Sequence, residues 1–258
     1  MLAGVFQSNG GGLTPQVRLE KLATVLAENT LDLIVCPELF LSGYNVPDEL
    51  PKLAQAPDSA LCEQVTQLAR QNNTAIIYGY PEREGDFVYN TAACISAQGK
   101  LIAKHRKMLL PPGHEVDLFT AGNKYTLFEL GGFRCGLLIC YEVEFPETVR
   151  ALVQAGAQLV IVPTALYDNW GVITETLVPT RALENGVWLI YANHAGVENG
   201  RRYFGSSCIV SPEGKDAARA GSQEQPIIAQ LDLERVVAAR QRLPYLPDLE
   251  DFQNRLKE

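Results

Sequence analysis

The segment that most constrains the fold runs from Cys135 to Glu147 and reads Cys-Gly-Leu-Leu-Ile-Cys-Tyr-Glu-Val-Glu-Phe-Pro-Glu. Its first half is an unbroken apolar run, which is typical of a strand buried on both faces. Acidic and aromatic residues follow Cys140, and Pro146 stands where the first turn of a helix is expected, which we extend to about Ala155. Cys140 is therefore predicted at the carboxyl end of a buried strand, where α/β proteins build their sites. Such a thiol is either a nucleophile or a structural side chain, because free cysteine is often buried.

The composition favours a single domain that spans residues 1–258. The chain is 47% hydrophobic, enough for a sizeable core, and no Ser/Gly/Pro-rich linker or repeat divides it. A net charge of −8 argues against nucleic acid or an anionic membrane as a partner. The N-terminus lacks the basic and apolar parts of a signal peptide, and no stretch of about 18 apolar residues occurs. We therefore expect a soluble cytoplasmic protein. Its six cysteines, without close pairing or a Cys-x-x-Cys motif, indicate reduced thiols and no zinc site.

Two further segments place reactive side chains near predicted strand ends. Glu38 directly follows the predicted strand 31–36, although a glutamate in a loop is ordinarily solvated. The basic run Lys104-His105-Arg106-Lys107 stands out in an acidic protein and follows a predicted hairpin. It is either a solvated turn, or one of its cations faces a site, where an ammonium would lower a thiol pKa or stabilise an oxyanion.

The remaining pattern alternates strands and helices, with hairpins between some strands. Strands are predicted over 2–7, 31–36, 74–80, 87–96, 101–104, 125–130, 133–140, 157–163, 187–193, 202–211 and 227–231, and helices over 15–29, 59–71, 146–155, 174–185 and 232–242. Because hairpins interrupt the alternation, we expect an α/β protein with mixed sheets.

Three segments resemble the signature motifs of the nitrilase superfamily of carbon-nitrogen hydrolases. They are Pro37-Glu38-Leu39-Phe40, His105-Arg106-Lys107 with Leu109, and Ile139-Cys140-Tyr141-Glu142 with Phe145-Pro146-Glu147. Supporting segments occur along nearly the whole chain, among them Ser42-Gly43-Tyr44, Gly79-Tyr80-Pro81-Glu82, Tyr89-Asn90 and Val162-Pro163-Thr164-Ala165. The resemblance implies an αββα sandwich with two mixed β-sheets, whose subunits pair as homodimers or larger homo-oligomers.

The resemblance also implies a Glu-Lys-Cys triad made of Glu38, Lys107 and Cys140, with Glu115 as a second glutamate. The segment that carries Glu115 is shorter and more proline-rich than in many members. In the implied chemistry the Cys140 thiolate attacks an amide, Glu38 transfers protons, and Lys107 and the backbone N–H of Tyr141 bind the oxyanion. Glu115 would orient Lys107 or the substrate. No cofactor or metal is expected.

The expected reaction is hydrolysis of a small primary aliphatic amide to a carboxylic acid and ammonia through a thioester. Segments 36–45, 78–83 and 243–249 resemble bacterial aliphatic amidases of the 5-aminopentanamidase type, which act on omega-amino amides. A distal ammonium would need an acid, because an uncompensated buried charge is costly. The candidate acids are Glu142, Glu144 and Asp168, and the candidate aromatic walls are Tyr44, Tyr141 and Trp170.

Structural readings of these residues stay open. In these structural readings, Glu142 and Glu144 pair with Arg150 or with a partner subunit rather than with substrate. The three aromatic side chains then belong to the core or to a dimer interface. Arg181 and Glu184, at i and i+3 on one predicted helix, are expected to form a structural ion pair, and Asn185 to end that helix.

Three alternatives to an omega-amino amidase remain. The same triad would serve an N-carbamoyl amine hydrolase, which releases carbon dioxide as well as ammonia. A papain-like pair would instead require His105, His114 or His194 beside Cys140. An inactive interaction protein with the same fold is the alternative from another class.

Overall fold

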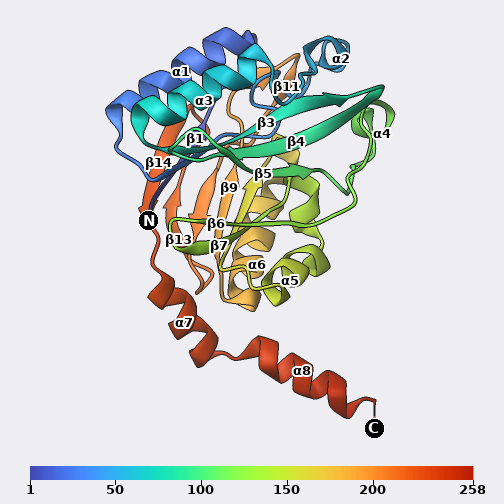
Figure 1. Ribbon diagram of the computed structural model, residues 1–258. Helices are drawn as coiled ribbons and strands as arrows, with labels where there is room; N and C mark the ends of the chain where they lie inside the picture. Colours follow the sequence, from blue (N-terminus) through green and yellow to red (C-terminus); the bar gives the residue numbers. More distant parts are fainter. Residues whose placement is uncertain (258) are drawn as a thin grey trace.

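Two six-stranded mixed sheets pack face to face, and helices cover the outer face of each (Figure 1). The computed structural model describes residues 1–257. The first sheet has the order β14-β1-β2-β3-β4-β5, with β1, β2 and β3 parallel to one another and the other pairs antiparallel. These strands are Gln225–Gln230, Leu2–Gln7, Leu33–Val35, Ala75–Glu84, Phe87–Ile95 and Leu101–Arg106.

The second sheet has the order β13-β12-β9-β8-β7-β6, and its central strands β7, β8 and β9 are parallel. The strands in this order are Asp216–Arg219, Cys208–Val210, Trp188–Ala192, Leu159–Pro163, Phe133–Leu137 and Thr126–Leu130. A separate two-stranded hairpin joins β10 (Val197–Glu198) to β11 (Arg201–Arg202).

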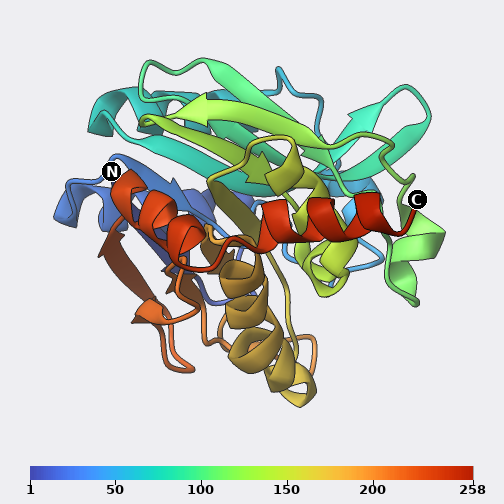
Figure 2. The same cartoon turned by 90° about the horizontal axis from the view of Figure 1, so that it is seen from below.

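Helices α1 (Pro15–Glu28) and α3 (Ala60–Asn72) lie on the first sheet, and α5 (Pro146–Gln154) and α6 (Val178–Asn185) lie on the second. The prediction of an αββα sandwich with two mixed sheets is thus confirmed. Shorter helices are α2 (Leu50–Leu53) and α4 (His114–Leu118), and the chain ends with α7 (Leu233–Arg242) and α8 (Tyr245–Arg255). Seen from below, α7 and α8 form one C-terminal arm that passes beside α6 (Figure 2). None of these helices, within residues 1–257, has the length and apolar character needed to cross a membrane.

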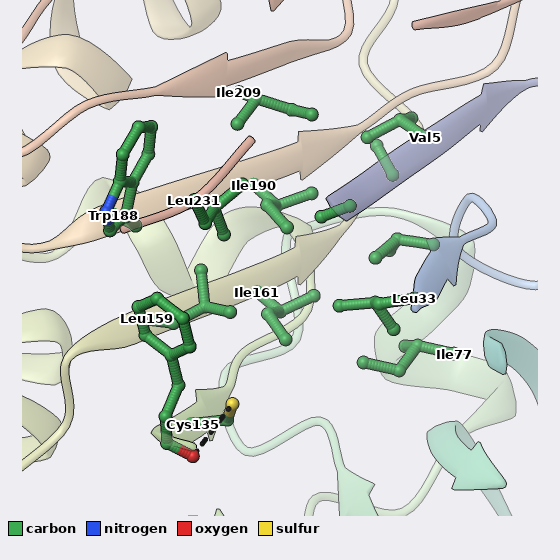
Figure 3. Close-up of a cluster of buried hydrophobic side chains, with 14 of the residues drawn as sticks. Val5, Leu33, Ile77, Cys135, Leu159, Ile161, Trp188, Ile190, Ile209 and Leu231 are labelled. Carbon is green, nitrogen blue, oxygen red and sulfur yellow. Dashed lines mark hydrogen bonds between the residues drawn. The ribbon is translucent and has the colours of Figure 1, made fainter. Parts of the chain in front are cut away.

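The main core lies between the two sheets. Val5, Leu33 and Ile77 extend from the first sheet toward Leu159 and Ile161 of the second (Figure 3). All five side chains are fully buried. Truncating one such leucine or isoleucine to alanine should cost about 2–5 kcal/mol of folding free energy, because it leaves a cavity in a densely packed interior. The two sheets are therefore held in a fixed mutual position.

Several predicted boundaries are wrong for local reasons. The predicted strand 202–211 is interrupted, because Gly205 (φ 70°) and Ser206 (φ 52°) adopt left-handed backbone conformations between β11 and β12. The predicted helix 174–185 is a π-helical turn, Ile173–Leu177, followed by α6. Helix α8 was not predicted, and it has no buried residue. Strand β5 continues to Arg106, two residues beyond its predicted end.

Candidate active site

The four predicted catalytic side chains meet at one end of the sandwich. Glu38 follows β2 and Lys107 follows β5 in the first sheet, whereas Cys140 lies just beyond β7 in the second. Glu115 lies in the single turn of α4. A backbone hydrogen bond from Glu38 N to Thr164 O, 3.3 Å long, connects the loops of the two sheets at this end.

Lys107 lies between the two glutamates. Its Nζ donates to Glu38 Oε1 at 2.7 Å and to Glu115 at 2.6 and 2.9 Å. Asn90 Nδ2 donates to Glu38 Oε1 at 2.7 Å and to Glu115 Oε2 at 3.2 Å, and Tyr44 Oη donates to Glu115 Oε1 at 2.7 Å. Lys107 and both glutamates are at most 1% exposed, so the network is shielded from water.

One ammonium faces two carboxylates in this cluster, and the pKa values of both Glu38 and Lys107 are raised. Burial, opposed by Lys107 and reinforced by Glu115, raises the pKa of Glu38 to about 7. Burial alone would lower the pKa of Lys107, but the carboxylates of Glu38 and Glu115 outweigh it and raise that pKa. The site thus combines a permanent cation with a carboxyl group that can gain or lose a proton near neutral pH.

Glu38 has an acceptor available for proton transfer. Its Oε1 accepts hydrogen bonds from Lys107 and Asn90, while its buried Oε2 has no hydrogen-bond partner among residues 1–257. Burial, followed by the charge of Glu38, raises the pKa of the Cys140 thiol, and Lys107 opposes this effect. A raised pKa favours the thiol form of Cys140, and Glu38 is the charged group that acts on it most strongly.

The backbone at Cys140 is in the left-handed region, with φ 49°, and Leu39 after Glu38 has φ 48°. Such conformations cost about 1–3 kcal/mol for residues other than glycine and concentrate at functional sites. Cys140 begins a 3₁₀ turn, Cys140–Glu144, in which the N–H of Tyr141 is among the first amides. The first N–H groups of a helical turn have no partner within it, so this one is suited to bind an oxyanion.

Comparisons with known proteins agree with this geometry. The family model described as carbon-nitrogen hydrolase matches residues 16–241. The chain belongs to the carbon-nitrogen hydrolase family.

The curated relatives of this carbon-nitrogen hydrolase include a hydrolase encoded in the pqqF 5′ region of Pseudomonas protegens, 41% identical over 89% of this chain and 82% of the relative. An (R)-stereoselective amidase from a Pseudomonas species is 34% identical, over 89% and 83% of the two chains. Among solved structures, a mutant of the amidase from Nesterenkonia sp. AN1 is 32% identical with a TM-score of 0.85 and covers 92% of each chain. It carries the acetamide moiety of fluoroacetamide on its active-site cysteine. The present chain is accordingly a hydrolase of carbon-nitrogen bonds, and the predicted superfamily is confirmed.

In this hydrolase Glu142 lies away from solvent. Its side chain is fully buried and accepts hydrogen bonds from Ile139 N, Met108 N and His105 Nε2. These donors occupy both oxygens, which corrects the expectation that Glu142 meets a substrate ammonium. The alternative pairing with Arg150 is also wrong, because Arg150 Nη2 donates to the backbone oxygen of Glu184.

The other predicted substrate-binding residues lie in different settings. Tyr44 is buried beside Glu115, and Tyr141 is half-buried with its ring 4.9 Å from that of Phe145. Glu144 is half-buried, and burial, opposed by Lys107, raises its pKa.

Asp168 and Trp170 lie in an exposed 3₁₀ turn after β8, and Trp170 is 54% exposed. Contact of any of these five residues with substrate stays a prediction. The ion pair of Arg181 with Glu184, 3.2 Å long, is confirmed, and α6 ends at Asn185 as predicted.

The three histidines of the hydrolase have other partners. His194 Nε2 donates to the backbone oxygen of Glu38 at 2.8 Å, and its pKa is lowered to about 3 by burial and then by Arg18. His105 binds Glu142, and the ring of His114 lies 5.0 Å from that of Tyr44. None of the hydrogen bonds in the described part of the chain joins a histidine to Cys140, which disfavours a papain-like pair.

Sequence reasoning gave no role to Asn90, Thr164 and Tyr167, and it considered His194 only as a papain-like partner of Cys140. Asn90 bridges the two glutamates, and His194 fixes the backbone of Glu38. Thr164 and Tyr167 lie close enough to Cys140 to interact electrostatically with it. Asn90 and Thr164 lie in segments that carried the family resemblance, so that resemblance was the available signal, but a motif alone does not assign a contact. Within residues 1–257 no cluster of three or more His, Cys, Asp or Glu side chains has the arrangement of a metal site.

Proposed function

We propose that this chain hydrolyses a small primary aliphatic amide to a carboxylic acid and ammonia, through a thioester on Cys140. The observation that carries the proposal is the buried Glu38–Lys107–Glu115 cluster, which lies at the same end of the sandwich as Cys140. Burial strengthens the electrostatic effect of the cluster on a developing oxyanion, because little water is present to screen it.

In the first half-reaction, Cys140 Sγ attacks the amide carbon while its proton moves to Oε2 of Glu38. The carbonyl electron pair moves to oxygen, and the resulting oxyanion accepts hydrogen bonds from Tyr141 N–H and Lys107 Nζ. An ammonium has three N–H donors. In the resting site Nζ contacts one oxygen of Glu38 and both oxygens of Glu115, so the oxyanion takes the donor that otherwise reaches Glu115 Oε2, while the bonds to Glu38 Oε1 and Glu115 Oε1 remain. The carbonyl then re-forms, the C–N bond breaks, and Glu38 returns the proton to the departing ammonia.

In the second half-reaction, water attacks the thioester and gives a proton to Glu38. The C–S bond breaks, the proton passes to Sγ, and the carboxylic acid leaves. One carboxyl group serves both halves, which suits a pKa of about 7 because the group must accept and release a proton in each cycle. Glu115 holds Lys107 in place and transfers no proton.

The substrate class that we propose first is an omega-amino amide of the 5-aminopentanamide type. With Glu142 occupied, Glu144 is the acid that we assign to a distal ammonium, because its carboxyl group lies within the electrostatic reach of Lys107. An N-carbamoyl amine is an alternative substrate for the same triad.

A specific observation favours a second candidate, an amide with a distal carboxylate. The guanidinium of Arg201 lies 5.2 Å from the centre of the Tyr167 ring, and Tyr167 interacts electrostatically with Cys140 and Glu38. Arg201 itself is exposed at the β10–β11 hairpin, so it is available to an anion approaching this side of the site.

The experiment is ammonia release from neutral, amino-terminated and carboxylate-terminated amides and from N-carbamoyl amines, with Cys140→Ala as the blank. Glu144→Gln should raise KM for the amino amide alone, and Arg201→Met should raise KM for the carboxylate-terminated amide alone. Carbon dioxide released together with ammonia would identify a carbamoyl substrate. Absence of turnover on the whole panel would overturn the proposal. The remaining hypothesis would then be an inactive interaction protein with the same fold.

We also propose that the chain forms a homodimer or larger homo-oligomer in a reducing compartment such as the cytoplasm. Helix α8 exposes Phe252 at 50%, and Leu256 just after it is 70% exposed, which supports assembly through the C-terminal arm. All six cysteines are free, which supports a reducing environment. Light scattering and fractionation of cells that express the chain test the two statements.

A further inference from the structure

Glu142 connects the two chain segments that carry the catalytic lysine and the catalytic cysteine. Its Oε1 accepts from Met108 N at 2.8 Å, and its Oε2 accepts from Ile139 N at 2.6 Å and from His105 Nε2 at 2.9 Å. Three donors converge on one carboxyl group that is fully buried. A carboxylate is the side chain that accepts several hydrogen bonds at once without donating any.

The three donors lie close to the proposed catalytic residues in the chain. Met108 directly follows Lys107, and His105 lies two residues before it at the end of β5. Ile139 directly precedes Cys140. β5 belongs to the first sheet and β7, which leads to Cys140, belongs to the second. The carboxyl group of Glu142 therefore connects the two sheets at the point where Lys107 Nζ and Cys140 Sγ must keep a fixed relative position.

We infer that Glu142 is a positioning residue, which together with His105 fixes the placement of Lys107 relative to the Cys140 nucleophile. The inference rests on the proposed amide hydrolysis and adds a residue to its machinery. Glu142 touches neither the substrate nor the reacting atoms in this scheme. It acts through the backbone on either side of them.

A count of protons indicates how Glu142 does this without altering the charge of the site. Thr126 Oγ1 donates its only proton to Lys104 O at 3.1 Å, so at 3.3 Å it accepts from His105 Nδ1. His105 Nδ1 thus carries one proton, and Nε2 shares a second with Glu142. The pair is neutral as a unit wherever the shared proton lies. It therefore leaves intact the balance between Lys107 and its two glutamates.

Substitution by glutamine isolates the positional effect. Glu142→Gln preserves size and the net charge of the pair, since His105 then remains neutral. The amide nitrogen cannot accept a hydrogen bond, so either Met108 N or the donors at Oε2 lose their acceptor. Misplacement of a catalytic group by about 1 Å can cost on the order of 10²-fold in rate.

Glu82 provides a matched control. It is a glutamate of the first sheet that is also fully buried, and it accepts hydrogen bonds from the side chains of Lys104, Arg106 and Thr91. Its hydrogen bonds involve no backbone amide beside Lys107 or Cys140. Glu82→Gln thus alters a buried carboxylate and its side-chain partners on β5, Lys104 and Arg106, but leaves in place the backbone hydrogen bonds beside Lys107 and Cys140.

The experiment compares Glu142→Gln and Glu82→Gln with the unsubstituted protein by kcat, KM, the pH profile and the rate of Cys140 alkylation by iodoacetamide. Peptide mass spectrometry assigns the alkylation to Cys140. For Glu142→Gln we expect kcat and the alkylation rate to fall about 10- to 100-fold, with KM within about threefold and the pH midpoint unchanged. For Glu82→Gln we expect all four quantities to stay within about threefold of the original. Equal effects of the two substitutions on alkylation, or a rise in KM alone, would overturn the inference.

His105 supplies a second test if Glu142→Gln fails to fold. His105→Leu removes the Nε2 donor and leaves both backbone amides on Glu142, so kcat should fall at unchanged KM. His105→Gln places an amide N–H near the position of Nε2 and should restore part of the rate, whereas equal rates for the two variants would count against the inference. If the unsubstituted protein turns over no amide, the proposed function fails, and the alkylation rates still decide the role of Glu142.

Discussion

The ammonium of Lys107 lies 2.7 Å from Oε1 of Glu38, with both side chains fully buried. The two residues follow strands β5 and β2, which are separated in the sheet by β3 and β4. The loop after β2 and the side chains of Glu38 and Lys107 together bridge this separation, and Asn90 on β4 donates to the same carboxylate from between the two strands. The charge of Lys107, the proposed oxyanion donor, is therefore also the partner that makes burial of the two glutamates tolerable.

Replacing Lys107 by methionine should impair both activity and stability. The substitution keeps the volume but leaves Glu38 and Glu115 without their cation, and breaking a buried pair costs roughly 3–5 kcal/mol. Loss of an oxyanion donor should lower kcat by about 10²-fold or more. Urea denaturation and ammonia release measure the two effects. Lys104→Met is the control, since Lys104 is 29% exposed and pairs with Glu82. Equal stability of the two variants would contradict the assigned role.

The pH dependence of activity should follow Glu38. As the base it must be ionised, so kcat/KM should fall as the pH drops through about 7. Because its folded-state pKa is raised from 4.5 to about 7, the folded protein binds the proton more tightly than the unfolded chain does. Stability contributed by this group is therefore present below pH 4.5 and is lost as the pH rises through about 7.

Glu38→Gln should consequently separate activity from stability. The variant loses the base, so its rate should fall by about 10²- to 10⁴-fold. At pH 8 it should be at least as stable as the original, because glutamine avoids burying an ionised carboxylate. Thermal unfolding at pH 5 and pH 8 measures this difference. A variant that is active with an unchanged pH profile would assign the base to another residue.

Cys140→Ser should retain the fold and lose turnover, since a hydroxyl is far less nucleophilic than a thiol. Rapid quenching of the unsubstituted protein during turnover should trap an acyl group, visible as added mass on the peptide that contains Cys140. Cys62, a buried residue of α3, serves as the control. Cys62→Ala should leave the acyl adduct in place, and an adduct on any other cysteine would refute the assignment.

Gly79 should be required for the geometry of Glu38. A Cβ at this position would lie 2.3 Å from Leu39 N and 2.9 Å from the carbonyl carbon of Glu38, closer than atoms can approach. Gly79→Ala must therefore displace the loop that carries the base, and we expect kcat to fall by about 10²-fold. Gly221→Ala is the comparison, because a Cβ there meets only Gln225 Nε2 at 3.6 Å. Comparable kcat values for the two alanine variants would show that the loop tolerates the shift.

The sequence allowed the sandwich and the central residues of the site to be predicted for different reasons. Buried apolar runs such as Leu159–Pro163 predicted strands and an α/β protein with mixed sheets, whereas the family resemblance supplied the αββα sandwich and the candidates Glu38, Lys107 and Cys140. The role of Glu142 was misjudged, because two of its three donors, Met108 N and His105 Nε2, come from the segment at the end of β5 and are brought near by the docking of the two sheets. Only the third donor, Ile139 N, is local, and it alone does not reveal the other two contacts.

The boundary errors have equally local causes. Ser206 adopts a left-handed conformation that residues other than glycine rarely do, so a continuous strand was the reasonable expectation. Helix α8 buries none of its residues, and the periodic burial that usually identifies a helix is therefore missing from it. Tyr167 was overlooked because an aromatic residue after a strand gives no sign of its distance from a thiol.

The hydrogen bonds of Glu38 N to Thr164 O and of His194 to Glu38 O mean that Glu38, the proposed base, is anchored to loops of the opposite sheet. The enzymatic rate therefore depends on how precisely the two sheets pack against each other. A chain that has all its strands and helices, but whose halves have joined loosely, would look native by circular dichroism and yet turn over nothing. During refolding, activity should return last, after every spectroscopic signal has reached its plateau.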